Sequence, residues 1–192
     1  MPGAIILFRL VINNGGYPIF VCMKAAQFKW ISTAAFAWLC SAALYAQETK
    51  TINNLDASSK TAYFDLETGR EVTDTSDDWD IAFNRTTVLV NGGSSGKGQV
   101  AAALLKDTSF KQVTKQPANG FKADSDQEKA IPTGSGNGWY EYNMADHSIS
   151  PIPGRILVIK SSSGKYAKLE ILSYYNKSNY NSANYSFRYS FL

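Results

Sequence analysis

The feature that most constrains the fold is a strand-like run that ends in a glycine-rich stretch, within residues 76–98. Trp79, Ile81 and Phe83 alternate with polar or small residues, and this period of two places the bulky side chains on one face of a β-strand. Residues 86–90 favour strand as well, so the pattern predicts strand over 79–90. The sequence Asn-Gly-Gly-Ser-Ser-Gly-Lys-Gly at 91–98 then predicts a tight loop, because glycine permits backbone conformations that other residues avoid.

Most of the chain beyond this stretch also reads as short strands separated by turns. Residues 155–160 and 166–175 flank a Ser-Ser-Ser-Gly-Lys sequence that predicts a β-hairpin. Residues 185–192 alternate strictly and predict a last strand, while 61–66 and 70–73 predict two strands around a glycine turn. The predicted fold class is all-β: a single-domain antiparallel β sandwich or open barrel-like sheet with little helix.

Helix is expected in two short segments only. Residues 100–105 contain three alanines and two leucines, which favour helix, with strand as the alternative. A helical turn is expected at 124–129, inside a proline- and glycine-containing region over 107–137. That region predicts a long loop, and long loops in compact domains are often functional. Residues 47–54 are polar, and no strand is predicted there.

The first 46 residues predict a targeting segment. A positive region follows Met23, which we take as the start of the signal, and an apolar stretch at 30–44 comes next. The apolar stretch is shorter than the roughly 20 residues of a membrane span. Small residues around Ala46 predict cleavage between Ala46 and Gln47. The mature chain is therefore expected to be exported, to the periplasm, the cell surface or the medium, without a transmembrane span.

Residues 47–192 form the predicted β domain. Both cysteines, Cys22 and Cys40, precede it, so no disulfide or thiolate site is expected in the mature chain. A lipid anchor at Cys40 is the less favoured alternative, because the bulky Trp38 and Leu39 stand where a bacterial lipoprotein signal has small residues. The formal net charge of +3 comes from the first 46 residues, and the balanced remainder gives no reason to expect a nucleic-acid partner.

The residue inventory argues against an enzyme. His147 is the single histidine, so a multi-histidine metal site or a second imidazole is not available. Asp77, Asp78 and Asp80 lack the full calcium-loop pattern, and turn or capping roles are expected for them. Residues 92–98 resemble a phosphate-binding loop only superficially. The spacing between the glycines is one residue short, and the magnesium-binding Ser or Thr is missing.

The segment from Tyr140 to His147 carries the candidate ligands. Met144 is the only methionine of the mature region, and His147 lies three residues further on. Thioether and imidazole groups are both axial ligands of haem iron, although two ligands in one loop do not easily reach opposite haem faces. The alternative is that Met144 fills a gap in the core and His147 is a surface loop residue beside Asp146.

Several motifs, taken in order, resemble the HmuY-like family of haem-binding proteins of Bacteroidota-type bacteria. The matching pieces are Tyr-Phe-Asp-Leu-Glu-Thr-Gly at 63–69, Trp-Asp-Ile-Ala-Phe-Asn-Arg at 79–85, the glycine-rich 91–98, Gly-Lys-Tyr-Ala-Lys-Leu at 164–169 and Ser-Tyr-Tyr at 173–175. The resemblance implies an all-β fold that holds haem between two protein side chains. It also implies transfer of the haem to an outer-membrane receptor during iron acquisition.

The chain departs from the family's bis-histidine pattern, because His147 is its only histidine. Other family members use methionine, so the resemblance implies Met144 as one ligand and His147 as the alternative. Tyr140 and Tyr142 are candidates to stack on a porphyrin, and the loop lysines Lys111, Lys115 and Lys122 to pair with propionates. A second hypothesis remains open: a non-enzymatic surface module on the same scaffold that binds a glycan or a protein instead of haem.

Overall fold

The computed structural model describes residues 9–12, 18–21, 48–73 and 77–192, which belong to two separate units, Met1–Leu44 and Tyr45–Leu192. In the first unit, β1 (Arg9–Ile12) pairs with β2 (Pro18–Val21) in antiparallel register. The predicted targeting segment otherwise lies outside the described residues and stays a prediction. Among the described residues, none belongs to a helix long and apolar enough to cross a membrane.

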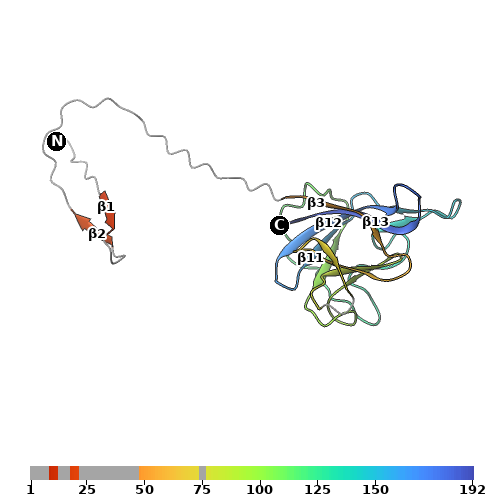
Figure 1. Ribbon diagram of the computed structural model, residues 1–192, viewed down its shortest axis with the longest axis horizontal. Coiled ribbons are helices and arrows are strands. Elements are labelled where there is room, and N and C mark those ends of the chain that lie inside the picture. Colours follow the sequence, from red (N-terminus) through yellow and green to blue (C-terminus); the bar gives the residue numbers. More distant parts are fainter. Residues whose placement is uncertain (1–8, 13–17, 22–47, 74–76) are drawn as a thin grey trace, which may run out of the picture. The chain divides into compact units, whose positions relative to one another are not determined.

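A five-stranded antiparallel sheet includes the last three strands of the chain, β11, β12 and β13 (Figure 1). Its strand order is β3-β13-β12-β11-β8. The strands are β3 (Lys50–Asp56), β8 (Ala101–Leu105), β11 (Ile156–Lys160), β12 (Tyr166–Tyr175) and β13 (Ser182–Phe191). Strands β11 and β12 form the predicted hairpin, and β13 is the predicted last strand.

A four-stranded antiparallel sheet has the order β5-β4-β6-β7. Its strands are β4 (Ala62–Asp65), β5 (Arg70–Val72), β6 (Ile81–Asn84) and β7 (Thr87–Val90). A separate two-stranded hairpin is formed by β9 (Tyr140–Tyr142) and β10 (Ile149–Pro151). The described residues contain no helix, and the predicted all-β fold is confirmed.

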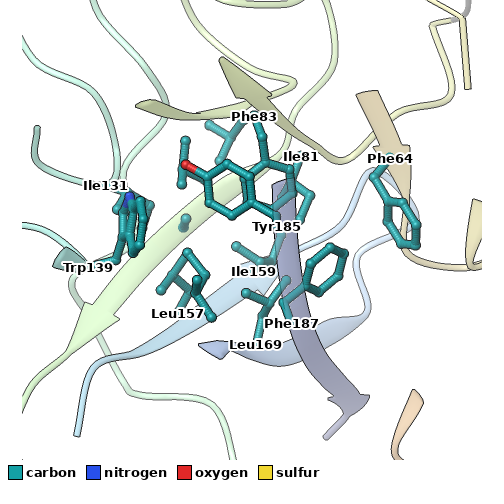
Figure 2. Packing of buried hydrophobic residues seen from close by; sticks show 14 of the residues in the cluster. Phe64, Ile81, Phe83, Ile131, Trp139, Leu157, Ile159, Leu169, Tyr185 and Phe187 are labelled. Atoms are coloured by element: carbon teal, nitrogen blue, oxygen red, sulfur yellow. The ribbon is translucent and has the colours of Figure 1, made fainter. Parts of the chain in front are cut away.

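The two larger sheets pack face to face around one hydrophobic core (Figure 2). Phe64 and Phe83 of the four-stranded sheet lie with their ring centroids 5.3 and 5.4 Å from that of Phe187 on β13. Tyr185, also on β13, packs on Phe83 at 4.3 Å. Aliphatic side chains fill the space around these rings: Ile81, Val88, Val90, Leu157, Ile159, Leu169 and Ile171. The arrangement is a β sandwich, with the inward positions alternating along each strand.

The five-stranded sheet is also covered on its outer face. A second buried cluster lies there: Phe110, Val113, Ile156 and Val158. Because β11 is buried on both faces, its apolar run does not alternate. The Lys168 ammonium and the Arg188 guanidinium each lie 4.6 Å from the centroid of the Phe110 ring, which fixes this segment of the long loop on the sheet.

The glycine-rich loop is built around the buried side chain of Asn91. The Asn91 amide donates hydrogen bonds to the backbone oxygens of Asp77 (2.9 Å) and Trp79 (2.8 Å), and its oxygen accepts one from the Gly98 N–H (2.9 Å). A Cβ atom at Gly96 would lie 2.2 Å from the Asn91 side-chain oxygen and 2.8 Å from the Trp79 ring. The loop is therefore glycine-rich because its backbone wraps closely around one amide.

Asp80, the last residue of the acidic run before β6, has the structural role that was predicted for the run. Asp80 is 1% exposed, and its carboxylate accepts hydrogen bonds from the Leu66 N–H (3.0 Å) and the Ser162 N–H (3.2 Å). These bonds join the β4–β5 turn to the β11–β12 turn. Burial raises the pKa of the Asp80 carboxyl, and the nearby charges of Asp65 and Glu67 raise it further.

The prediction of one strand over residues 79–90 is wrong. A turn at Arg85 and Thr86 separates β6 from β7, which pair with each other. Arg85 has a φ of 50°, and its backbone oxygen accepts a hydrogen bond from the Tyr185 hydroxyl at 2.5 Å. Turn residues with positive φ are usually Gly, Asn or Asp, so no sequence signal marked this turn.

The two helix predictions are also wrong. Residues 101–105 form β8, which pairs with β11, so the strand alternative applies. Instead of the helical turn at 124–129, the buried Asp124 carboxylate accepts hydrogen bonds from the N–H groups of Val90 (3.2 Å) and Ala130 (2.8 Å). Strand β3 was not predicted, because its side chains are mostly polar and exposed on the edge of the sheet.

Candidate functional site

The candidate ligands lie in the six-residue tip of the β9–β10 hairpin, residues 143–148. The strands end where Tyr142 faces Ile149, and the Asn143 N–H donates to the Ser148 backbone oxygen at 2.8 Å. The Asn143 and Asp146 side chains accept hydrogen bonds from backbone N–H groups two residues on, at 2.9 and 3.0 Å. Such side-chain turns favour a compact loop, and the tip therefore has a defined conformation.

The base of the hairpin is anchored by aromatic side chains. Trp139 is 2% exposed, and its indole N–H donates to the Thr86 backbone oxygen at 2.9 Å. Its ring lies 5.4 Å from Tyr185 and 4.9 Å from Tyr140. The Tyr175 hydroxyl accepts a hydrogen bond from the Ile149 N–H at 2.9 Å. The hairpin is thus held to the sandwich core at its base, while residues 143–147 of its tip are exposed.

The tip borders a hollow of about 430 Å³, lined by Glu141, Tyr142, Asn143, Met144, Ser148 and Ser150. Met144 is 76% exposed, so the proposal that it fills a gap in the core is wrong. Tyr142 and Met144 border this hollow together. Neither Tyr140, which packs on Trp139, nor His147 is among the lining residues. The structure therefore places Tyr142 and Met144 at the hollow and Tyr140 at the base of the hairpin, while His147 is an exposed tip residue that does not line the hollow.

His147 and Tyr142 form a hydrogen-bonded pair that the sequence analysis did not anticipate. The Tyr142 hydroxyl and His147 Nδ1 are within hydrogen-bond distance, and the ring centroids are 6.0 Å apart. His147 has a φ of 58°, which turns the end of the tip back toward β9. In the sequence, the only hint of this contact is that the two residues are five positions apart in one predicted loop. The contact itself depends on the β9–β10 register and on the positive φ of His147.

The charges around the tip are mostly acidic. Hydrogen bonds from Ser148 lower the pKa of the Asp146 carboxyl, and the Glu141 carboxylate borders the hollow. None of the predicted propionate partners Lys111, Lys115 and Lys122 lines the hollow. Lys122 is paired with Glu128 at 3.1 Å instead. The hollow itself offers no cation for an anionic ligand group.

Three side chains in or next to the tip are of types that can ligate iron. A thioether, a phenol and an imidazole lie within six residues, and all three groups are known ligands of haem iron. Within the described residues, no group of three or more His, Cys, Asp or Glu side chains could hold a metal ion by itself. Met144 and Tyr142 line the hollow, whereas His147 is hydrogen-bonded to Tyr142, so the three side chains do not form a metal centre of their own.

The fold and the site together define an antiparallel β-sandwich protein with an exposed hairpin tip that contains a methionine and a histidine. A family model described as HmuY protein matches residues 57–189, which is more than half of the chain. The chain therefore belongs to the HmuY family. No curated protein matches it.

Solved structures share the fold at low sequence identity. Apo PinO from Porphyromonas gingivitis is 18% identical with a TM-score of 0.57, over 76% of this chain and 97% of that one. A protein from Bacteroides vulgatus, described as a candidate HmuY-like heme binding protein, is 15% identical with a TM-score of 0.53, over 75% and 91%. A candidate lipoprotein from Bacteroides fragilis is 19% identical with a TM-score of 0.51, over 74% and 87%.

Proposed function

We propose that this protein binds haem or a related porphyrin outside the cytoplasm and is not an enzyme. Membership of the HmuY family supports this function, as does the description of a structural relative as a candidate heme binding protein. The observation that carries the proposal is the β9–β10 tip, which presents a 76% exposed methionine beside a hollow. An exposed thioether has no packing role to explain its position, whereas iron ligation requires such access.

In this proposal, the tip forms one wall of the haem site, with Met144 as the first candidate ligand and His147 as the alternative. Haem supplies an iron that accepts axial ligands. The Met144 thioether is a soft donor and prefers ferrous iron, so binding should strengthen on reduction if Met144 is the ligand. Tyr140 and Tyr142 remain proposed porphyrin contacts, Tyr142 from the hollow and Tyr140 from the base of the hairpin.

The proposed biological role is haem acquisition for iron. An exported protein that holds haem would pass it to an outer-membrane receptor, and export would follow from the targeting segment predicted before Gln47. The family membership and the candidate-lipoprotein relative both support a location outside the cytoplasm. The proposed partners are therefore haem or porphyrin and a haem receptor.

Titration of the purified protein with haemin tests this function, with the Soret absorption as the readout. The wild-type protein should give a saturable shift of the Soret band, and Met144→Ala should weaken binding and change the reduced spectrum. Leu172→Ala is the matched control, because Leu172 is a 44% exposed aliphatic residue on β12, outside the tip. If the wild type shows no haem spectrum, the function is instead that of a surface module for a glycan or a protein.

A further inference from the structure

Lys129 is a half-buried cation whose hydrogen-bond partners are all neutral oxygens. Its Nζ donates to Ser95 Oγ at 3.0 Å, to Ser94 Oγ at 3.3 Å and to the Ser125 backbone oxygen at 3.4 Å. Within the described residues, no ion pair joins Lys129 to a carboxylate. The three N–H groups of the ammonium are thus all directed at protein atoms, but none of these atoms neutralises its charge.

The glycine-rich loop holds this ammonium in place. The Ser94 N–H donates to the Asp124 backbone oxygen at 2.8 Å, which fixes the loop beside the segment that contains Lys129. A Cβ atom at Gly93 would lie 1.8 Å from the same oxygen, so only glycine permits this approach. The backbone therefore positions the two serine hydroxyls, and these position the ammonium. A cation that is already fixed loses little side-chain entropy when it binds an anion.

Lys129 also borders a hollow of about 630 Å³, which we call the polar hollow. Its lining residues are Thr87, Lys106, Ser125, Asp126, Gln127, Glu128, Lys129, Pro132, Thr133 and Asn137. All of them except Pro132 have polar or charged side chains, and none is aromatic. A hollow of this volume can hold a small molecule, and the hydroxyl and amide groups of its wall favour a ligand that makes many hydrogen bonds.

The charges of the polar hollow favour an anionic ligand. Glu128 pairs at 3.1 Å with Lys122, a residue outside the lining, so its charge is already compensated. Among the lining residues, this leaves the Asp126 carboxylate against the two cations Lys106 and Lys129. The polar hollow therefore has a net positive charge, and a ligand with one carboxylate and several hydroxyl groups matches both its charge and its wall.

We propose that the polar hollow binds an acidic saccharide, with the sugar carboxylate on Lys129. The bond from Lys129 to the Ser125 backbone oxygen is the longest of its three, and both residues line the hollow. The carboxylate replaces this bond with a charge-assisted one, while the serines of the glycine-rich loop keep the other two. Gln127, Thr133 and Asn137 bind the sugar hydroxyls. The site is independent of haem binding, because it shares no lining residue with the hollow at the β9–β10 tip.

The test is a titration of the purified protein with D-glucuronate, followed by ¹H–¹⁵N correlation NMR. The backbone amide signals of residues 125–129 should shift and reach saturation. Lys129→Gln should weaken binding by about tenfold, because a hydrogen bond from a charged donor is lost. Lys106→Gln should weaken it by about threefold, as expected for an exposed charge, and this exposed position leaves the fold intact. Lys97→Gln is the matched control, because Lys97 is an exposed lysine of the glycine-rich loop that does not line the polar hollow.

Three further ligands test the chemical class. D-glucose has the hydroxyl groups without the carboxylate, acetate has the carboxylate without the hydroxyl groups, and inorganic phosphate is a different anion. D-glucuronate should bind about tenfold or more tightly than each of them. Equal affinity for acetate or phosphate would overturn the saccharide assignment. The site itself is overturned if D-glucuronate shifts no signals, or if Lys129→Gln and Lys106→Gln both bind it like the wild type. The haemin titration is a separate measurement, so failure here leaves the proposed haem function standing.

Discussion

Single buried residues at the start of β6 connect several parts of the sandwich. Trp79 is 5% exposed and packs edge-on against Tyr63, with ring centroids 5.1 Å apart. Its backbone oxygen also accepts a hydrogen bond from Asn91. Trp79 and Phe83 are both buried, as the alternation of the sequence predicts.

Trp79→Ala should lower the free energy of unfolding by about 3–5 kcal/mol, because a large buried ring is lost and a cavity remains. Urea denaturation followed by circular dichroism measures the change. Trp139 remains in the variant, so its fluorescence can follow unfolding as a second signal. A Trp79→Ala protein with the stability of the wild type would show that the ring contributes no packing.

Glu67 gives the protein a stability term that depends on pH. Hydrogen bonds from the Ser163 hydroxyl and from Lys165 Nζ (3.0 Å) lower the pKa of the Glu67 carboxyl from its ordinary value of 4.5. An acid with a lowered folded pKa stabilises the fold above the unfolded value, and this contribution is lost as pH falls through the folded value. The raised pKa of Asp80 acts in the opposite direction.

Glu67→Gln should therefore destabilise the protein at neutral pH, and the difference from the wild type should shrink as pH falls below 4.5. Both proteins contain Asp80, so the comparison isolates Glu67 together with its repulsion of the Asp80 carboxylate, which raises the Asp80 pKa in the wild type only. Urea denaturation between pH 7 and pH 3 provides the measurement. A difference that grows toward acid pH would contradict the assigned role of Glu67.

At the scale of elements, the loop after β7 needs glycine because its backbone passes very close to the Asn91 side chain. Gly96 needs no unusual φ, but a Cβ there would meet Asn91 at 2.2 Å, and Asn91 is fixed by its hydrogen bonds. Gly164, in the β11–β12 turn, has the opposite properties: a φ of 82° and open space around it.

Gly96→Ala should cost more stability than Gly164→Ala. The first substitution forces the Asn91 side chain and the loop backbone apart, with an expected loss of about 2–4 kcal/mol through broken buried hydrogen bonds. The second adds only the strain of a left-handed alanine, about 1–2 kcal/mol. Thermal unfolding of the two variants under the same conditions shows which one loses more stability. The reverse order would show that the loop adapts to a side chain at Gly96.

The elements that the sequence predicted are those whose apolar residues alternate or whose turns contain glycine. Strands β4, β11, β12 and β13 follow from that pattern alone. Strand β8 could not be distinguished from helix, because alanine and leucine favour helix and only pairing with β11 decides the outcome. The turn at Arg85 was missed because a residue other than glycine has a positive φ there.

For the candidate site, the sequence located the segment but not its internal arrangement. Met144 and His147 were selected by residue type and spacing, and both lie in one hairpin tip. The exposure of Met144, the hollow beside it and the hydrogen bond between Tyr142 and His147 depend on three-dimensional placement. A one-dimensional pattern contains none of these, because the hairpin register and the φ of His147 set them.

For the whole molecule, we expect that the candidate site can be removed without unfolding the β sandwich. Tyr142 and Ile149 face each other at the end of the hairpin, so a two-residue Asn-Gly turn can replace residues 143–148. The free energy of unfolding of the shortened protein should lie within about 1 kcal/mol of that of the wild type, because the removed side chains are mostly exposed. It should fail to bind haemin in the Soret titration. Retained binding would place the haem site elsewhere.

The targeting segment predicts the form in which the protein functions. Expression in a bacterial host that exports it should yield a chain that begins at Gln47, as measured by intact mass spectrometry of the exported protein. Retention of residues 1–46 would contradict the signal assignment. A mass that indicates a chain beginning at a lipid-modified Cys40 would favour the anchored alternative.

The aromatic anchor at the base of the β9–β10 hairpin has a consequence for how such a protein can change over generations. Trp139, Tyr175 and Tyr185 hold the hairpin on the sandwich core without help from residues 143–147. Substitutions in the tip should therefore change the stability of the fold little, and selection for a stable fold does not remove them. Over generations the side chains of the tip, and with them whatever the tip binds, can therefore change while selection on stability preserves the same scaffold.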